Sequence, residues 1–402
     1  MTAETVPLRR ISEIVAGQSP PNDAVTDLVD GLPFVQGNAE FGPVSPNPKF
    51  QCITAPKQCR VGDLLLSVRA PVGAMNLADR EYGIGRGLAA VRLSAPGDQR
   101  FLSYCISASM PMLLSLATGS TFEAVTRDHV AAHRIPWLET AEQRRIADFL
   151  DDQVSRIDAT LRATEQQISL LRSRETGWLD HQMQVLGREF GRVPLRRWIT
   201  HIEQGWSPLC DSRPADAQEA GVLKLGSVRG GRFREQENKA MSEDTAPVLQ
   251  YEIRPRDLLV SRANTPELVG EAAVVPDGVR SQLYLCDLLY RVRTSIEEVE
   301  FISAALRSRR SRGLLGVIAR GTSQSMVKLR GEDIGNVSIP AAPSAARRML
   351  ADEAVATMAD SDAAVAAIQD MRTLLQERKR TLITAAVTGE FDVSAASGRN
   401  IA

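Results

Sequence analysis

The chain has 402 residues, of which 43% are hydrophobic and 24% charged, a balance that is typical of a globular protein and excludes a disordered or fibrous one. Its net charge of −1 neither indicates nor excludes a nucleic-acid partner, because an overall balance can hide local basic patches. Five scattered cysteines, no signal peptide and no apolar run of about 18 residues predict reduced thiols and a soluble, cytoplasmic protein without a membrane partner.

Arginine makes up 42 of the 48 basic residues, and only six are lysines. The planar guanidinium suits phosphate groups and guanine edges, so the bias is compatible with a nucleic-acid partner. A GC-rich genome that favours arginine codons explains the same bias, and composition alone does not separate the two explanations.

The chain also contains a long internal repeat, because residues 6–10 recur letter for letter at 193–197. Further matches follow in the same order: 17–20 with 205–208, 63–67 with 257–261, 117–120 with 319–322, 135–136 with 339–340, and 144–145 with 347–348. The offset grows from 187 to about 203, which indicates loop insertions in the second copy. The unit is too long for a solenoid repeat and indicates a duplicated domain.

Each copy begins with a globular part that contains short β-type runs, separated by Gly and Pro turns, and a short helical stretch. In chain order these elements are expected at 32–36, 64–68, 88–93 and 100–116, and again at 222–228, 257–261, 272–275, 288–292 and 298–317. The predicted boundaries are 1–139 for the first domain, 140–187 for a central helix, 188–342 for the second domain, 343–391 for a C-terminal helix and 392–402 for a tail.

The central helix is predicted by a start signal and by an apolar seam. Thr140 and Gln143 have the spacing of a capping box, in which each side chain satisfies a free backbone N–H. Seam residues then recur in steps of three and four, as in a coiled coil. They are Val154, Ile157, Leu161, Thr164, Ile168, Leu171, Glu175, Trp178, Gln182 and Val185.

The C-terminal helix follows Pro343, with Ser344 as its cap and Gly389 at its end. Its seam is Leu350, Ala354, Thr357, Ser361, Ala364, Ile368, Met371, Leu375, Arg378 and Leu382. Because one seam is rich in Ile and Leu and the other in Ala, the two helices are expected to pair antiparallel and hold the globular parts apart. A local coiled coil without a spacing role is the alternative.

Motifs for catalysis are missing. Residues 19–22 (Ser-Pro-Pro-Asn) imitate the loop that holds a flipped adenine in methyltransferases, but they lack its aromatic residue and are interpreted as a turn. The glycine-rich run 83–87 is either a plain loop or an approach to a DNA backbone. His129 and His133 have zinc-ligand spacing without a third ligand, so surface or helix-capping histidines are favoured. No Gly-Lys pair forms a P-loop. We therefore expect no catalytic residue, no cofactor and no metal.

In their order and their recurrence, the motifs resemble those of the DNA specificity subunits of type I restriction-modification systems, over essentially the full length of the chain. The motifs are residues 33–38 with 222–227, 61–69 with 255–262, 119–121 with 321–323, the helix start at 135–147, and the C-terminal run 379–389. The chain departs from the pattern at the second helix, where Ala345 and Ala346 precede Arg347 in place of a Glu-Gln pair.

The resemblance implies an α/β (α+β) fold, with two duplicated globular target-recognition domains joined by two long antiparallel coiled-coil helices in pseudo-two-fold symmetry. It implies that each domain reads one half of a bipartite site in double-stranded DNA. It also implies that the helices fix the gap and dock two adenine-N6 methyltransferase subunits, and with them the restriction and translocation subunits. A coiled-coil adaptor with two protein-binding domains and no DNA role is the alternative.

Base readout needs forked donors and amides, and phosphates need cations and small hydroxyls. Loop residues of these types are expected to bind DNA: Gln36, Arg69, Arg86, Ser120, Thr121 and Arg127 in the first domain, and Lys224, Arg229, Arg262, Asn264, Arg320, Thr322, Ser323, Gln324 and Lys328 in the second. The alternatives are a solvated charge for any one arginine and a tight turn for the Gly-Ser/Thr loops. The helix residues expected to form the spacer and partner surface are Val154, Ile157, Leu161, Ile168, Leu171, Ile368, Leu375 and Leu382.

Overall fold

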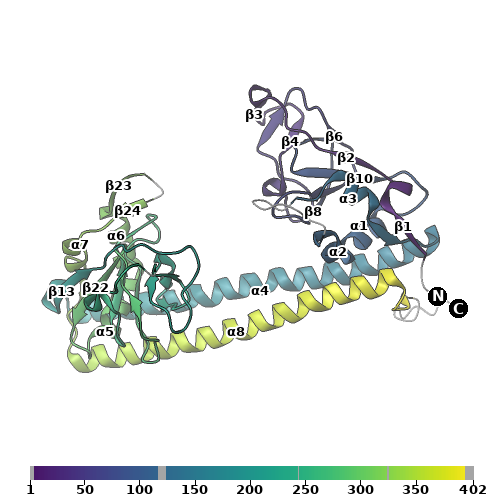
Figure 1. The fold of residues 1–402 in the computed structure, drawn as a ribbon. Helices are drawn as coiled ribbons and strands as arrows, with labels where there is room; N and C mark the ends of the chain where they lie inside the picture. The colour runs from purple at the N-terminus through teal and green to yellow at the C-terminus, as the bar shows by residue number, and fades with distance from the viewer. Residues whose placement is uncertain (1–3, 116–123, 243, 324–325, 394–402) are drawn as a thin grey trace. The chain divides into compact units, whose positions relative to one another are not determined.

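The computed structural model describes residues 4–115, 124–242, 244–323 and 326–393. The chain forms two compact units, unit 1 (Met1–Thr164 and Asp370–Ala402) and unit 2 (Glu165–Gln369). Each unit contains one globular part and part of the two long helices, α4 (Thr140–Glu189) and α8 (Ser344–Thr388) (Figure 1). Among the described residues, no helix is long and apolar enough to cross a membrane.

Among the described residues, the globular part of unit 1 contains two larger sheets, one two-stranded sheet and three short helices. The antiparallel sheet has the order β2 (Ser12–Ala16), β10 (Leu88–Leu93), β7 (Leu64–Ser67), β8 (Met75–Leu77). The other sheet has the order β3 (Val25–Asp27), β5 (Phe50–Cys52), β4 (Pro33–Val35), β9 (Tyr82–Ile84), β6 (Gln58–Cys59). The remaining elements are β1 (Thr5–Pro7), which pairs with β11 (Arg134–Pro136), and the helices α1 (Gln99–Ala108), α2 (Met110–Leu114) and α3 (Arg127–Ala132).

Unit 2 repeats this plan with additional short strands. Its main sheet has the order β13 (Ile199–Gln204), β22 (Leu289–Thr294), β18 (Leu258–Ser261), β20 (Ala272–Val274). Smaller sheets are β17 (Asn238–Ala240) with β14 (Gly221–Leu223) and β21 (Leu283–Tyr284), β15 (Val228–Arg229) with β16 (Arg232–Phe233), β19 (Ala263–Asn264) with β24 (Met326–Lys328) and β23 (Arg320–Ser323), and β12 (Arg192–Pro194) with β25 (Ser338–Pro340). Its helices are α5 (Val299–Arg307), α6 (Arg309–Ile318) and α7 (Gly331–Gly335).

The main sheets of the two units share one topology, which confirms the duplication. The order β2-β10-β7-β8 matches β13-β22-β18-β20, and Leu64 faces Val91 as Leu258 faces Val292. Both faces of these sheets are covered, because Leu64 lies in one core cluster and Leu65 in another. Burial on both faces explains why the central strand is a continuous apolar run rather than an alternating one.

Within each unit, α4 and α8 pack antiparallel. In unit 1, Ile146 of α4 and Val387 of α8 share a core cluster, and in unit 2 Leu179 and Leu350 do so. Of the expected spacer residues, Ile157 and Ile368 are buried. The others are half-buried, namely Val154, Leu161, Ile168, Leu171, Leu375 and Leu382.

Three expected seam positions are wrong. Val185 is 40% exposed while Met183 is buried, and Met371 is 40% exposed. Arg378 is exposed, and the neighbouring Lys379 faces α4. The seam shifts by a residue or two because a straight helix of 3.6 residues per turn drifts from a strict seven-residue repeat.

The expected capping box at the start of α4 is also wrong. Gln143 is fully buried, and its Oε1 accepts from the backbone N–H of Asp98 at 2.9 Å while its Nε2 donates to the carbonyl of Leu138 at 2.8 Å. Gln143 therefore ties α4 to the globular part of unit 1 instead of closing back on Thr140. In α8, Arg347 ties the helix to the globular part of unit 2 in the same way. It donates to the carbonyl of Ala342 and, from Nε at 2.7 Å, to Glu298. Arg347 thus occupies the position of Gln143, not that of Arg144 as the sequence repeat indicated.

Candidate nucleic-acid interface

Three of the expected DNA-binding residues of unit 1 lie at one end of its sheets. The backbone N–H of Val68 donates to the carbonyl of Gly87 at 2.9 Å, which places Arg69 opposite Arg86. The backbone N–H of Gly85 donates to the carbonyl of Val35 at 2.9 Å, which brings Gln36 beside the same turn. The side chains of Gln36, Arg69 and Arg86 are all exposed.

The glycine-rich run 83–87 has a packing role in this site. A Cβ atom at Gly85 would lie 2.5 Å from Oε1 of Gln36, so a larger residue would displace the amide. Gln36 and Arg86 line one hollow together with Ser19 and Pro20, and Gln36 Nε2 donates to Ser19 Oγ at 3.5 Å. An amide, a guanidinium and a hydroxyl are therefore grouped on one surface, which is the donor and acceptor set that DNA recognition needs.

The other expected residues of unit 1 lie apart from this group or outside the described residues. Arg127 begins α3, is exposed, and donates from Nε to the carbonyl of Ile14 at 3.1 Å. Ser120 and Thr121 lie outside the described residues. His129 caps the start of α3 and His133 is its C-cap residue, as expected, although His133 is buried and its ring bonds Ser109 Oγ at 2.7 Å. Burial lowers the pKa of His133.

In unit 2, the three-stranded sheet β19-β24-β23 brings together a second group of the expected DNA-binding residues. Lys328 faces Ala263 on one side and Arg320 on the other, and Asn264 faces Val327. In Figure 1, β23 and β24 lie at the top of this globular part. Lys328 is exposed, and the Arg320 side chain is 56% exposed although it forms an ion pair of 3.0 Å with Asp333. Thr322 and Ser323 lie in β23, but their side chains and all of Gln324 are outside the described residues.

Arg69 and Arg262, which end the paired motifs 61–69 and 255–262, do not occupy equivalent positions in the structure. The backbone N–H of Arg262 donates to the carbonyl of Leu288, as that of Val68 does to Gly87, so Arg262 takes the place of Val68 and not of Arg69. The Arg262 guanidinium is half-buried, lies 5.8 Å from the centre of the Tyr290 ring and donates to the Tyr290 hydroxyl at 3.3 Å. Its contacts are internal to unit 2.

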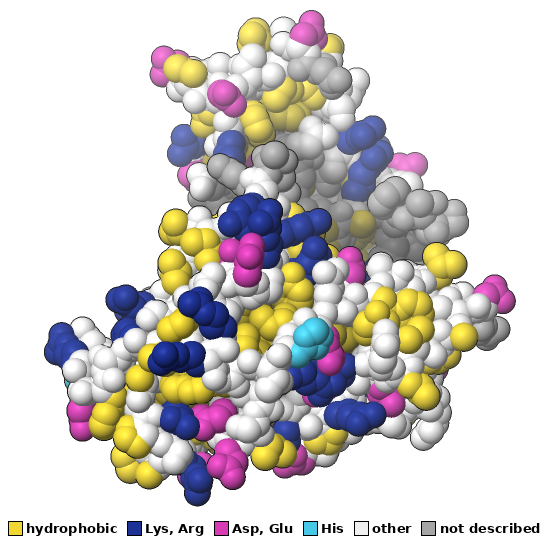
Figure 2. Space-filling view, turned by 90° about the vertical axis from the view of Figure 1, so that its left-hand side faces the viewer, with side chains coloured by type: hydrophobic (Ala, Val, Ile, Leu, Met, Phe, Trp, Pro, Cys, Tyr) yellow, Lys and Arg dark blue, Asp and Glu magenta, His cyan; other side chains and the backbone are white. Residues whose placement is uncertain are grey.

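The two remaining expected residues of unit 2 lie away from the β19-β24-β23 sheet. Lys224 is half-buried and forms an ion pair of 3.2 Å with Glu237. Arg229 is exposed in the β15–β16 hairpin. Figure 2 shows Lys and Arg side chains in groups on one face with acidic side chains among them, so a net charge near zero coexists with local basic patches.

The repeated Asp-Leu-Leu motif has a structural role in both units. Asp63 accepts from the backbone N–H of Arg60 at 2.8 Å and binds Arg92 at 2.5 Å. Asp257 likewise accepts from Arg254 at 2.9 Å and binds Arg293 at 2.9 Å. This aspartate caps the turn before the central strand and anchors an arginine of the neighbouring strand, which explains why the motif recurs.

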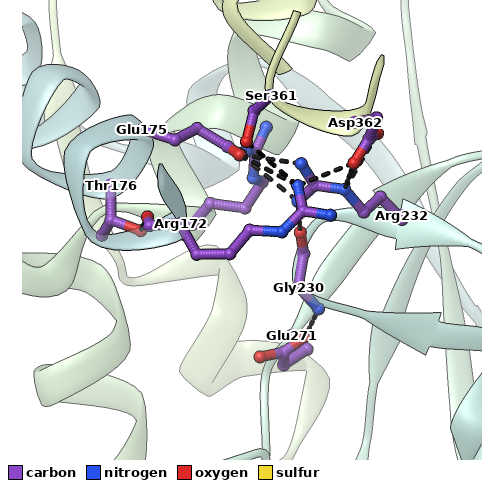
Figure 3. Close-up of polar contacts among 9 residues, drawn as sticks. Arg172, Glu175, Thr176, Gly230, Arg232, Glu271, Ser361 and Asp362 are labelled. Carbon is purple, nitrogen blue, oxygen red and sulfur yellow. Dashed lines mark hydrogen bonds and ion pairs between the residues drawn. The ribbon is translucent and has the colours of Figure 1, made fainter. Parts of the chain in front are cut away.

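An ion cluster that the sequence did not single out lies in unit 2, where α4, α8 and the globular part meet (Figure 3). The buried Glu175 binds Arg232 at 2.7 Å, Arg307 at 2.7 Å and Arg172 at 3.4 Å. Asp362 of α8 binds Arg232 and Arg172, each at 2.7 Å. Burial lowers the pKa of the Arg307 guanidinium. The sequence offered one sign of this cluster, a glutamate at a seam position, but its partners Arg232 and Arg307 lie 57 and 132 residues away along the chain.

Residues 5–170 match the family described as the type I restriction modification DNA specificity domain. This part of the chain is similar to a type I specificity domain. The resemblance seen in the sequence is thereby confirmed, and the repeated topology of unit 2 presents a second domain of the same plan in the same chain.

Two relatives are named as specificity subunits of type I restriction enzymes. A protein of Methanocaldococcus jannaschii described as a type I restriction enzyme MjaX specificity subunit is 38% identical over 139 residues, which are 34% of this chain and 33% of that protein. The type I restriction enzyme EcoEI specificity subunit of Escherichia coli is 30% identical over 150 residues, which are 37% of this chain and 25% of that protein. The matched regions thus span about a third and a quarter of these relatives.

The fold of the whole chain is similar to that of a solved structure from work on complex assembly and conformational transition of the type I R-M system. That comparison covers 97% of this chain and 98% of the other, with a TM-score of 0.61 and 17% sequence identity. At this identity the likeness concerns the fold, and it confirms the expected mixed α and β architecture with two long helices.

Proposed function

We propose that this protein is the non-catalytic DNA-recognition subunit of a type I restriction-modification complex. Each globular part would read one half of a bipartite site in double-stranded DNA. The helices α4 and α8 would fix the unread gap and dock two adenine-N6 methyltransferase subunits, to which the restriction and translocation subunits attach. We place the two recognition domains at residues 1–139 and 188–342.

One observation carries this proposal. The same sheet topology occurs twice in one chain, and each copy presents a side-chain amide with two exposed cations, the amide being exposed in unit 1 and half-buried in unit 2. In unit 1 the group is Gln36, Arg69 and Arg86, and in unit 2 it is Asn264, Arg320 and Lys328. B-DNA has two-fold symmetry, so two related readers suit a site made of two half-sites. The match of residues 5–170 to a DNA specificity domain supports the same function.

The remaining expected contacts stay proposals of lower rank. Arg127 and Lys224 are engaged in contacts within their own units, and Arg262 is better placed to hold the β18–β22 region than to reach a base. Ser120, Thr121, Thr322, Ser323 and Gln324 are kept as candidate contacts because a hydroxyl or an amide near a glycine in the sequence suits a phosphate.

The test is co-expression with the methyltransferase subunit of the same system, followed by sequencing of N6-methyladenine in the host DNA. We expect methylation at a bipartite motif with a fixed gap. A chain with Arg69→Ala and Arg86→Ala should lose specificity in one half of that motif, and a chain with Arg320→Ala and Lys328→Ala in the other half. Arg80→Ala, at an exposed arginine of unit 1, serves as the control.

Formation of a complex that never methylates DNA would leave only a scaffold role, and the absence of any complex would overturn the proposal. Binding of the chain to an acidic protein with no salt-dependent binding to duplex DNA would favour the adaptor instead, because phosphate contacts release counterions and make DNA binding depend steeply on salt.

A further inference from the structure

The ion cluster of unit 2 borders a hollow in which arginines outnumber acidic residues. Its charged lining consists of Arg172, Glu175, Arg229, Arg232, Arg234, Glu271, Arg307, Arg309 and Arg312. Asp362 and Asp180 neutralise two of these arginines from outside the lining, through contacts to Arg232 and Arg309. Seven arginines therefore stand against four carboxylates within the described part of unit 2.

The arginines at the base of the hollow are already engaged. Arg232 and Arg307 are bound to the buried Glu175. Arg312 donates to backbone carbonyls, including that of Glu267 at 2.7 Å, and its burial lowers its pKa. These side chains hold the lining of the hollow in place and contribute positive electrostatic potential. Most of their N–H donors already form hydrogen bonds.

Arg229 and Arg234 are different, because both are exposed and neither has a carboxylate within 4.0 Å among the described residues. Arg229 lies in β15 beside the hairpin turn, Arg234 directly follows β16, and both line the hollow. A guanidinium without a counter-charge, beside walls of low dielectric constant, attracts an anion more strongly than the same group on an open surface.

The glycines of the β15–β16 hairpin keep the hollow open. Gly230 and Gly231 both adopt positive φ, at 61° and 80°, as the two central residues of a tight hairpin turn require. A Cβ atom on Gly231 would lie 2.2 Å from Nε of Arg307, so glycine is also needed for that arginine to pass beneath the turn to Glu175. The hollow is therefore a consequence of the local sequence and not a gap between loosely packed elements.

The matching place in unit 1 has a different lining. Because Gln143 corresponds to Arg347, positions 204 residues apart are equivalent in the helices, and Lys379 and Asp158 take the places of Glu175 and Asp362. Lys379 binds Asp158 directly at 2.7 Å. The neighbouring groove is lined by Pro43, Val44, Met75 and Leu77, with Arg100 and Lys379 as its cations.

We propose that the arginine-lined hollow of unit 2 binds a phosphate group, with Arg229 and Arg234 as its contacts. The planar guanidinium matches phosphate oxygens, and the lining contains no aromatic side chain on which a base would stack. The site would thus recognise phosphate without regard to base sequence. The phosphate comes either from the DNA backbone, in which case the inference rests on the proposed function, or from a free polyphosphate.

The experiment uses the full chain and compares Arg229→Ala/Arg234→Ala with the control Arg80→Ala/Arg348→Ala, which removes two exposed charges elsewhere. Affinity for duplex DNA of unrelated sequence is measured as a function of KCl concentration. Loss of two phosphate contacts should reduce the slope of log K against log salt by about 1.8, while the control leaves it unchanged. The loss should be equal for every DNA sequence tested.

A second titration uses inorganic tripolyphosphate without DNA. If the double variant loses tripolyphosphate binding while its DNA slope stays unchanged, the site takes a free polyphosphate. If the wild-type chain binds no DNA but binds tripolyphosphate through these two arginines, the proposed function fails and the phosphate site stands. If neither DNA binding nor tripolyphosphate binding distinguishes the double variant from the control, the inference is overturned.

Discussion

The two units attach their globular parts to the long helices in opposite ways. In unit 1, Lys379 and Asp158 neutralise each other between the helices, and both side chains are about one-third exposed. In unit 2, the equivalent positions hold Glu175 and Asp362, which repel each other and are neutralised by Arg232 and Arg307 of the globular part together with Arg172 of α4. One charge reversal on a helix therefore changes which elements are held together, although the backbone plan stays the same.

The main sheets show a second difference of this kind. In unit 1, Val15 faces Ala90, and Ala90 is buried. In unit 2, the matching pair is Glu203 and Arg291, with Arg291 only 2% exposed. Arg291 binds Glu203 at 2.5 Å and Asp257 at 3.1 Å, and it donates to the carbonyl of Gln250 at 2.6 Å. A large buried ion network thus replaces a small apolar contact.

The largest expected effect comes from Glu175→Ala. Removal of this carboxylate leaves Arg232 and Arg307 without their main counter-charge in a buried place, so we expect unit 2 to lose about 3 to 5 kcal/mol of stability. Lys379→Ala, at the equivalent position of unit 1, should cost less than about 1 kcal/mol because its pair is partly exposed. Amide hydrogen exchange in β22 and β10 measures the two units separately. Equal losses would mean that the two attachments do not differ.

Arg291→Ala should destabilise unit 2 by about 3 kcal/mol, because Glu203 and two backbone carbonyls lose their donor. The double variant Arg291→Ala/Glu203→Val reproduces the residues of unit 1 and should recover part of that loss. Urea denaturation of the three chains provides the comparison. A double variant that is no more stable than the single one would show that Glu203 is not the group left unsatisfied.

A substitution in one unit should affect the recognition of one half-site only. Arg320→Ala should lower affinity for one half-site by about 1 to 3 kcal/mol, the usual contribution of a base contact, and leave the preference for the other half intact. Binding to duplexes with one scrambled half-site measures this effect. A matching loss in both halves would contradict a division of recognition between the two units.

The smallest effect concerns pH and unit 1 alone. Burial lowers the pKa of His133, so the unfolded chain binds a proton more readily than the folded one. The stability contributed by neutral His133 is therefore complete above its unfolded pKa of about 6.5 and decreases as pH falls toward the folded pKa. The melting temperature of unit 1 should decline over this window in the wild-type chain and decline less in His133→Asn. An identical decline in both chains would assign the effect to other groups.

Several features of this protein follow from its sequence alone. The duplication is visible in repeated letters, the continuous apolar run at 64–66 predicts a strand, and Gly389 predicts the end of α8, where it adopts φ 78°. These signals are local, because strand formation, turns and helix ends depend on residues within a few positions of one another.

The partners of the charged residues were decided by tertiary structure. Arg69 and Arg262 end the two paired motifs, but Arg69 is exposed, whereas Arg262, one position nearer to the central strand, contacts Tyr290. Gln143 has the spacing of a cap, yet it bonds a backbone group 45 residues away. Glu175 lies on a helix seam and is satisfied only by arginines that the folded domain brings to it. Local patterns determine the elements, whereas the choice among distant ionic partners depends on which side chains become buried together.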